Sequence, residues 1–209
     1  MLTVYTFSGD PAQAETLPCL DGTPPRRPES RIWRALLRFA LTEAGIPGDI
    51  RDVTVSPTGR PYLPASPLDF SPTHTAGLVA LAVLPEGGRI GIDAEAKRKR
   101  DISRLARAAA RWFSPAEQEA VRAALLEGPD SAEDCFLQIW TAKEALVKRS
   151  GAGLQGMRLV DSTAPADCAL RMFRVAGTVL TVAAQESVIG SCRLLPVRIR
   201  DGKICRMEA

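Results

Sequence analysis

This chain of 209 residues has no closely spaced cysteine pair, no apolar run long enough to span a membrane and only one histidine. Each of these features argues against a class of protein or of site. The five cysteines are odd in number, widely spaced and never arranged as C-x-x-C, which argues against a disulfide framework and a zinc site. The longest apolar run, residues 76–84, is about half as long as a membrane-spanning helix needs to be. We therefore expect reduced cysteines and no membrane span.

The first residues also lack the marks of a secretion signal. Residues 1–7 have no basic segment before their apolar side chains and no small-residue cleavage site, so they predict a first strand. A cytoplasmic location is the resulting expectation. The net charge of +3 is mild, but the basic run 97–100 continues into a helix with further arginines, which would attract an acidic partner.

Two acidic side chains share one face of a predicted strand. The segment 91–95 reads Gly-Ile-Asp-Ala-Glu, and alternate side chains of an extended segment point the same way. Asp93 and Glu95 should therefore face one common point, with their Cα atoms about 7 Å apart.

A predicted helix brings a third acid and a lysine. Trp140, Glu144 and Lys148 are four residues apart and so lie along one stripe. If this helix packs on the strand, three carboxylates converge beside a lysine and repel one another by about 4 kcal/mol per close pair. A bound divalent cation would relieve this repulsion, and we expect Asp93, Glu95 and Glu144 to be its ligands. Oxygen ligands suit Mg²⁺, and Mn²⁺ is also possible.

These two patterns, Gly-Ile-Asp-x-Glu and Trp-x-x-Lys-Glu-Ala-x-x-Lys, together resemble the 4′-phosphopantetheinyl transferases, specifically the longer single-chain kind. The resemblance implies an α+β fold of two pseudo-symmetric α/β lobes. Each lobe would be a small, mainly antiparallel sheet packed with a long helix, with the active site at their interface. We expect an N-terminal lobe at residues 1–100 and a C-terminal lobe at residues 101–209.

The resemblance also implies a coenzyme A site. A stripe of arginines lies on the helix predicted from about residue 29 to 44. The segment Thr58-Gly59-Arg60-Pro61 is similar to the family's Gly-Lys-Pro element. Residues 70–75 are similar to the family's Phe-Asn-Leu-Ser-His-Ser element. Pro72 departs from the last pattern and removes a backbone donor. By resemblance, the residues expected to bind coenzyme A are Arg31, Arg34, Arg60, Thr73, His74 and Lys148.

The reaction implied by the resemblance is transfer of 4′-phosphopantetheine from coenzyme A to a serine of an acyl or peptidyl carrier protein, releasing adenosine 3′,5′-bisphosphate. The catalytic residues would be Glu144, Lys148 and Lys143, with Lys148 stabilising the departing phosphate. Two candidates remain for the base that takes the serine proton: Glu144 and a metal-bound water. Lys143 could assist either.

Alternatives remain open for the partners and for turnover. The basic run could dock the acidic helix common in carrier proteins or could be an ordinary solvated face. A coenzyme A or nucleotide sensor on the same scaffold would bind without turnover. A magnesium-dependent nuclease is a further rival, but few aromatic residues lie near the arginines, so we expect no nucleic-acid partner. A monomer is expected.

Overall fold

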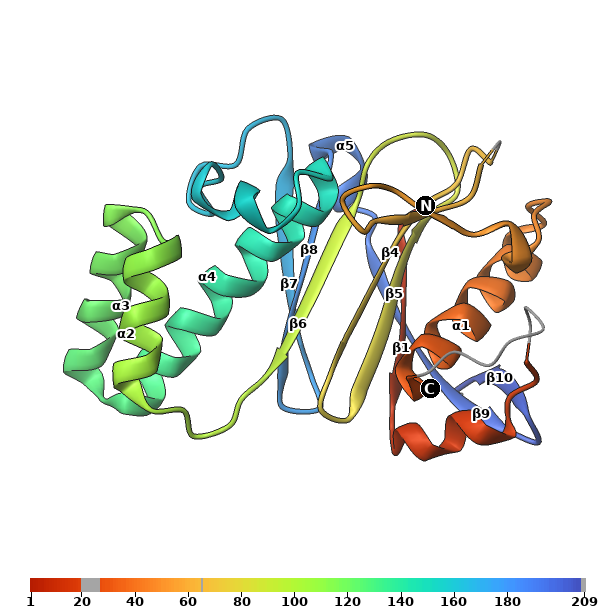
Figure 1. Ribbon diagram of the computed structural model, residues 1–209, viewed down its shortest axis with the longest axis horizontal. Helices are drawn as coiled ribbons and strands as arrows, with labels where there is room; N and C mark the ends of the chain where they lie inside the picture. Colours follow the sequence, from red (N-terminus) through yellow and green to blue (C-terminus); the bar gives the residue numbers. More distant parts are fainter. Residues whose placement is uncertain (20–26, 65, 208–209) are drawn as a thin grey trace.

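The computed structural model describes residues 1–19, 27–64 and 66–207 (Figure 1). Strands and helices alternate along the chain in short blocks. The strands are β1 (Thr3–Ser8), β2 (Thr54–Val55), β3 (Pro61–Tyr62), β4 (Asp69–Thr75), β5 (Leu78–Leu84), β6 (Gly91–Ala96), β7 (Ala169–Val175), β8 (Thr178–Ala184), β9 (Arg193–Arg200) and β10 (Lys203–Arg206). The helices are α1 (Pro28–Ala44), α2 (Ile102–Trp112), α3 (Pro115–Glu127), α4 (Pro129–Ser150) and α5 (Glu186–Ile189), with 3₁₀ turns η1 (Pro11–Thr16), η2 (Ile50–Asp52) and η3 (Leu154–Arg158).

The strands form two main sheets and one short hairpin. The larger sheet has the order β10-β9-β1-β5-β4, the smaller sheet has the order β6-β8-β7, and β2 pairs with β3. Only the β1–β9 pair is parallel among these ladders; every other pair is antiparallel. This arrangement confirms the predicted α+β class with small, mainly antiparallel sheets and long helices.

The two sheets do not divide the chain at residue 100. Strands β9 and β10 come last in the sequence, yet β9 pairs with β1 in the larger sheet. Conversely, β6 precedes residue 100 but pairs with β8 in the smaller sheet. The expected lobes, 1–100 and 101–209, therefore do not coincide with the sheets, because each sheet takes strands from both halves of the sequence.

The sheets lie face to face between helices, as Figure 1 displays from left to right. Helix α1 packs on the outer face of the larger sheet through Leu36 and Leu37, which meet Leu81 of β5 in one apolar cluster. The opposite face of β5, including Ala80, packs against Ile92 of β6 in a second cluster. All of β5 is buried as a result, which explains why the longest apolar run of the sequence is a strand covered on both sides.

Helix α4 covers the outer face of the smaller sheet, and α2 and α3 pack on α4 in turn. Three stacked aromatic side chains, Phe113, Phe136 and Trp140, join these helices. Helix α3 begins with a capping box, in which Ser114 and Glu117 each bond the backbone amide of the other. No helix in the described part of the chain is long and apolar enough to span a membrane.

Candidate functional site

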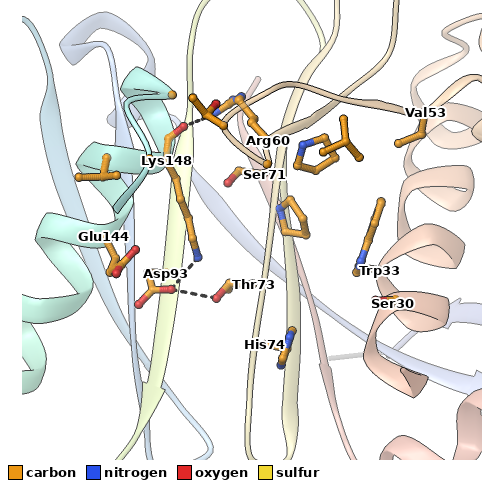
Figure 2. A pocket seen from close by; sticks show the side chains of 18 of the residues that line it. Ser30, Trp33, Val53, Arg60, Ser71, Thr73, His74, Asp93, Glu144 and Lys148 are labelled. Carbon is orange, nitrogen blue, oxygen red and sulfur yellow. Dashed lines mark hydrogen bonds and ion pairs between the residues drawn. The ribbon is translucent and has the colours of Figure 1, made fainter. Parts of the chain in front are cut away.

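A cavity of about 520 Å³ opens between α1 and α4, across the exposed edges of β4 and β6 (Figure 2). One wall comes from α1, with Trp33 and Arg34, and the opposite wall comes from α4, with Glu144 and Lys148. The floor is made by β4 and β6. Its polar side chains are Ser71, Thr73, His74 and Asp93.

Strands β4 and β6 are edge strands of different sheets and are joined by side chains. Hydroxyl groups at alternate positions of β4 all face β6, because alternate side chains share a face. Ser71 accepts a hydrogen bond from the amide of Ile92 at 3.3 Å, and Thr75 accepts one from the amide of Ala96 at 3.2 Å. Between them, Thr73 donates to Oδ1 of Asp93 at 3.2 Å. This seam fixes Asp93 at the junction of the two sheets.

Pro72 lies within this seam without breaking β4. The strand runs from Asp69 to Thr75 and pairs with β5 along its whole length, with Pro72 opposite Leu81. An edge strand tolerates proline because one row of its amides has no ladder partner. Pro72 therefore leaves the ladder between β4 and β5 uninterrupted.

Gly91 allows α4 to approach β6 unusually closely. A Cβ atom on Gly91 would lie 2.0 Å from the carbonyl oxygen of Ala145 and 2.5 Å from the amide nitrogen of Arg149. No side chain fits in that space, so the first residue of the Gly-Ile-Asp-x-Glu pattern sets the spacing between strand and helix. The adjacent Glu144 is thereby brought to the same side as Asp93.

Asp93 is the centre of the polar contacts in the cavity. Its Oδ1 lies 2.7 Å from Nζ of Lys148 and also accepts the Thr73 hydroxyl. Asp93 is 8% exposed, so this contact is shielded from bulk water. The pairing of an acid on β6 with a lysine near the end of α4 confirms that helix and strand pack together as the sequence predicted.

The other two acids experience the charge of Asp93. Burial and then the Asp93 carboxylate raise the pKa of Glu144, and the same two causes, in the same order, raise the pKa of Glu95. Glu95 lies 2.8 Å from Arg100, which offsets part of its charge. Glu144 makes no hydrogen bond or ion pair with any residue in the described ranges. The charges of Asp93, Glu95 and Glu144 therefore disfavour one another.

The donor set fits a hard divalent cation in chemistry and charge. All three side chains offer oxygen, and their mutual repulsion would be relieved by a cation. In the arrangement that the structure describes, no three acidic, histidine or cysteine side chains within residues 1–19, 27–64 and 66–207 converge tightly enough to hold a metal as they stand. Lys148 and Arg100 supply the positive charge beside Asp93 and Glu95.

The residues expected to bind coenzyme A occupy different positions. Thr73, His74 and Arg34 line the cavity, and the Arg34 guanidinium lies 4.6 Å from the centre of the Trp33 ring. His74 is exposed on β4. Arg31, although it is within the described residues, does not line this cavity and donates a hydrogen bond to the carbonyl oxygen of Leu17.

Arg60 also lines the cavity, but its guanidinium contacts protein groups. It forms a two-oxygen ion pair with Asp69, at 2.9 and 2.7 Å, and donates to the carbonyl oxygens of Ile90 and Lys148. The sequence indicated a phosphate-binding role for this position and gave no sign of these partners.

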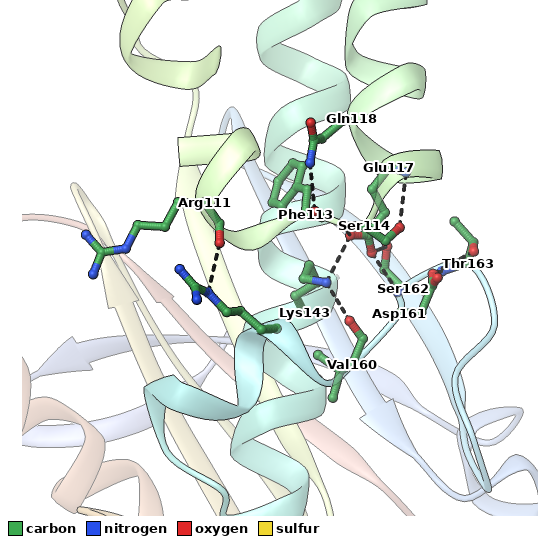
Figure 3. Close-up of polar contacts among 11 residues, drawn as sticks. Arg111, Phe113, Ser114, Glu117, Gln118, Lys143, Val160, Asp161, Ser162 and Thr163 are labelled. Carbon is green, nitrogen blue, oxygen red and sulfur yellow. Dashed lines mark hydrogen bonds and ion pairs between the residues drawn. The ribbon is translucent and has the colours of Figure 1, made fainter. Parts of the chain in front are cut away.

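Lys143 lies away from the cavity, which corrects the expectation that it assists the reaction directly. Its ammonium group is 2.9 Å from the carboxylate of Glu117 and also donates to the carbonyl oxygen of Val160 (Figure 3). The Lys143 side chain is 1% exposed. Consecutive helical residues point about 100° apart, so Lys143 faces α3 while Glu144 faces β6.

Glu117 connects three segments of the chain. Besides capping α3, it accepts hydrogen bonds from the amide and hydroxyl of Ser162, at 2.8 and 2.7 Å, and pairs with Lys143 (Figure 3). It therefore ties α3, α4 and the segment after η3 together. No signal in the sequence connects residues 117, 143 and 162.

Part of the basic run is used internally. Arg100 pairs with the buried Glu133 at 2.9 Å as well as with Glu95, and Lys97 pairs with Asp134 at 3.2 Å. Arg98 is mostly exposed. Only a portion of this run is thus presented to solvent, together with arginines of α2.

The family model described as the 4′-phosphopantetheinyl transferase superfamily matches residues 89–184, which include β6 and α4. The 4′-phosphopantetheinyl transferase AcpT of Escherichia coli O157:H7 is 34% identical over 141 residues, covering 66% of this chain and 66% of that protein. AcpT of Salmonella typhimurium is 34% identical over 142 residues, covering 67% of each. A 4′-phosphopantetheinyl transferase of Bacillus subtilis is 32% identical over 117 residues, covering 56% of this chain and 46% of that protein. The chain spans about two thirds of the length of the first of these relatives.

Proposed function

Because this chain belongs to the 4′-phosphopantetheinyl transferase superfamily, we propose that it transfers the 4′-phosphopantetheine arm of coenzyme A to a serine of an acyl or peptidyl carrier protein. The observation that carries the proposal is the grouping of Asp93, Glu144 and Lys148 around one cavity whose far wall bears Arg34. This cavity has acids and a base at one end and a cationic, aromatic wall at the other.

The proposed reaction breaks a phosphoanhydride bond of coenzyme A and forms a phosphate ester bond to the serine. The serine oxygen forms a bond to the phosphorus that carries the pantetheine arm, and the bond from that phosphorus to the bridging pyrophosphate oxygen breaks. Adenosine 3′,5′-bisphosphate leaves with the electron pair of the broken bond. The proton of the serine passes to a base in the cavity.

Lys148 is placed to stabilise the leaving phosphate, since its ammonium group already lies beside Asp93 in the cavity. Such a cation is most effective where charge develops in the transition state. Glu144 has no partner among the described residues, so one of its oxygens is free for the serine proton. The other oxygen can still serve as a ligand.

In this proposal Asp93, Glu95 and Glu144 hold the divalent ion, Mg²⁺ or Mn²⁺. When bound there, the ion offsets negative charge on the pyrophosphate. Thr73 supports this task by fixing Asp93 through its hydroxyl group. Arg100 supports it on the other side by orienting Glu95.

Coenzyme A would extend from the acids towards α1. Arg34 and the exposed His74 lie along that path, where a cation and an imidazole suit a phosphate or ribose. Arg31 is a weaker candidate, because it lies outside the cavity lining and its guanidinium is bonded to Leu17.

The carrier protein is proposed to dock beside the basic surface at the start of α2. Arg98, Arg104 and Arg107 are exposed there, and an acidic helix would be attracted to them.

Intact-mass analysis tests the proposed function. A panel of apo carrier proteins is incubated with this protein, coenzyme A and Mg²⁺, and a parallel sample contains a chelator. We expect a chelator-sensitive mass gain of one phosphopantetheine on at least one carrier. Binding of coenzyme A without any mass gain would instead support a sensor on the same scaffold.

A further inference from the structure

Both terminal nitrogens of the Arg60 guanidinium are bonded to groups of the protein itself. Its Nη2 lies 2.9 and 2.7 Å from the two oxygens of Asp69 and 2.9 Å from the carbonyl oxygen of Ile90. Its Nη1 donates to the carbonyl oxygen of Lys148. The side chain is 12% exposed, and the Asp69 carboxylate already balances its charge. A phosphate that took over these bonds would therefore have to displace a carboxylate and two carbonyl groups.

The bond to Lys148 completes the end of α4. The last carbonyl groups of a helix have no partner within the helix, and a cation near them is favourable. Helix α4 ends at Ser150, so the Lys148 carbonyl is one of these groups, and Arg60 satisfies it. Lys148 is thus held at both ends: its backbone by Arg60 and its ammonium group by Asp93.

The bond to Ile90 holds the start of β6. Ile90 immediately precedes that strand, its amide donates to Asp69 at 2.8 Å, and its carbonyl accepts from Arg60. The Arg60–Asp69 pair therefore binds the strand that carries Asp93 and the helix that carries Lys148. Both partners of the pair come from outside those two elements.

We propose that Arg60 is a positioning residue that locks the end of α4 to the start of β6, and that it does not bind a phosphate of coenzyme A. The proposal rests on the proposed function for its effect on turnover. Through this lock, Arg60 keeps Lys148 directed at Asp93. The planar guanidinium can donate hydrogen bonds to several acceptors in different directions at once. The ammonium group of a lysine is a compact point charge on a flexible stem and would not reproduce this set of bonds.

The variants Arg60→Lys and Asp69→Asn distinguish a positioning role of Arg60 from a phosphate-binding role. Asp69 does not line the cavity, so its substitution can affect coenzyme A only indirectly, through Arg60 or through the amide of Ile90. If Arg60 is a positioning residue, both variants lower kcat by about tenfold or more, while the Kd for coenzyme A changes by less than about threefold. The control is Arg51→Lys, at an exposed arginine paired with Asp49 outside the cavity lining.

Titration calorimetry measures coenzyme A binding, and carrier modification measures turnover. A rise of about tenfold or more in Kd for Arg60→Lys, with no effect of Asp69→Asn on Kd or kcat, would overturn the proposal. Full activity of Arg60→Lys would overturn it as well, since a lysine would then suffice.

Hydrogen exchange gives a readout that does not depend on turnover. The amide of Gly151 donates to the Val147 carbonyl at the end of α4. Both variants should speed exchange of this amide and its neighbours, while Arg51→Lys should not. Unchanged exchange in both variants contradicts the lock. If the wild-type protein binds coenzyme A but modifies no carrier, the proposed function fails while this measurement still decides the role of Arg60.

Discussion

The ammonium nitrogen of Lys148 lies 2.7 Å from Oδ1 of Asp93, which joins the end of α4 to the middle of β6 across the candidate site. Lys148 is about one-third exposed and Asp93 is nearly buried, so the pair faces the cavity from its inner wall. This ion pair brings the acid of the Gly-Ile-Asp-x-Glu pattern into contact with the last lysine of the Trp-x-x-Lys-Glu-Ala-x-x-Lys pattern.

Replacement of Lys148 by methionine should slow transfer by about 100-fold, because a cation directed at developing charge is lost. The carrier-modification rate measures the effect, and the circular dichroism spectrum checks that the fold persists. Lys203→Met, at an exposed lysine on β10, is the matched control and should retain the wild-type rate. A Lys148→Met variant as active as that control would remove Lys148 from the mechanism.

Gly91→Ala should separate β6 from α4, since the new Cβ would lie 2.0 Å from the Ala145 carbonyl oxygen. Overpacking of this kind costs about 1–3 kcal/mol, and the displacement of Glu144 should also reduce transfer. Urea denaturation and the transfer rate are the measurements. Gly190→Ala is the control, because a Cβ there meets no atom within 4 Å and its φ of −60° suits alanine. Equal behaviour of the two variants would refute the close packing.

Lys143→Met should destabilise the protein by roughly 3–5 kcal/mol, because it leaves the buried Glu117 carboxylate without its cation. Adding Glu117→Gln should recover part of that loss by removing the uncompensated charge. Urea denaturation of both single variants and the double variant forms the cycle. Strictly additive losses would mean that the two side chains do not interact.

Acid should weaken the contribution of Glu117. Burial raises the pKa of this carboxyl, but hydrogen bonds from Ser162, Lys143 and Ser114 outweigh burial and hold the pKa below its usual value of 4.5. A depressed folded pKa gives stabilisation that is complete above the usual pKa and is lost as the pH falls through the lower folded value. The free-energy difference between wild type and Glu117→Gln should therefore narrow below pH 4.5.

The control for this pH dependence is Glu119→Gln, because Glu119 is exposed and pairs only at the surface with Arg122 among the described residues. Its effect on the free energy of unfolding should be small at every pH. A difference between wild type and Glu117→Gln that stays constant from neutral to acid pH would contradict the assigned hydrogen bonds.

Local patterns in the sequence predicted much of the site. The alternation of Asp93 and Glu95, and the four-residue spacing of Trp140, Glu144 and Lys148, each follow from the geometry of a single element. Those patterns needed only one further step, the packing of α4 on β6. Gly91 permits that packing, and its place before Asp93 was visible in the sequence.

Contacts between distant segments could not be predicted in this way. Strands β1 and β9 lie near opposite ends of the sequence but pair with each other. Neither segment contains a pattern that predicts this pairing. The contacts of Arg60 with Ile90 and Lys148, and of Lys143 with Glu117, depend on how the helices and sheets pack together. The direction of a charged side chain on a helix between two packed neighbours depends on both neighbours, so the sequence did not reveal that Lys143 contacts Glu117 and not the cavity.

The measurement that tests the account most directly compares wild type with Glu144→Gln in two assays, coenzyme A binding and carrier modification followed by intact mass. Glutamine keeps the size of the side chain but removes its charge and its capacity to accept the serine proton. The account predicts that the wild type adds one phosphopantetheine and that Glu144→Gln binds coenzyme A but adds none. A Glu144→Gln variant that modifies the carrier at the wild-type rate would contradict the proposed site.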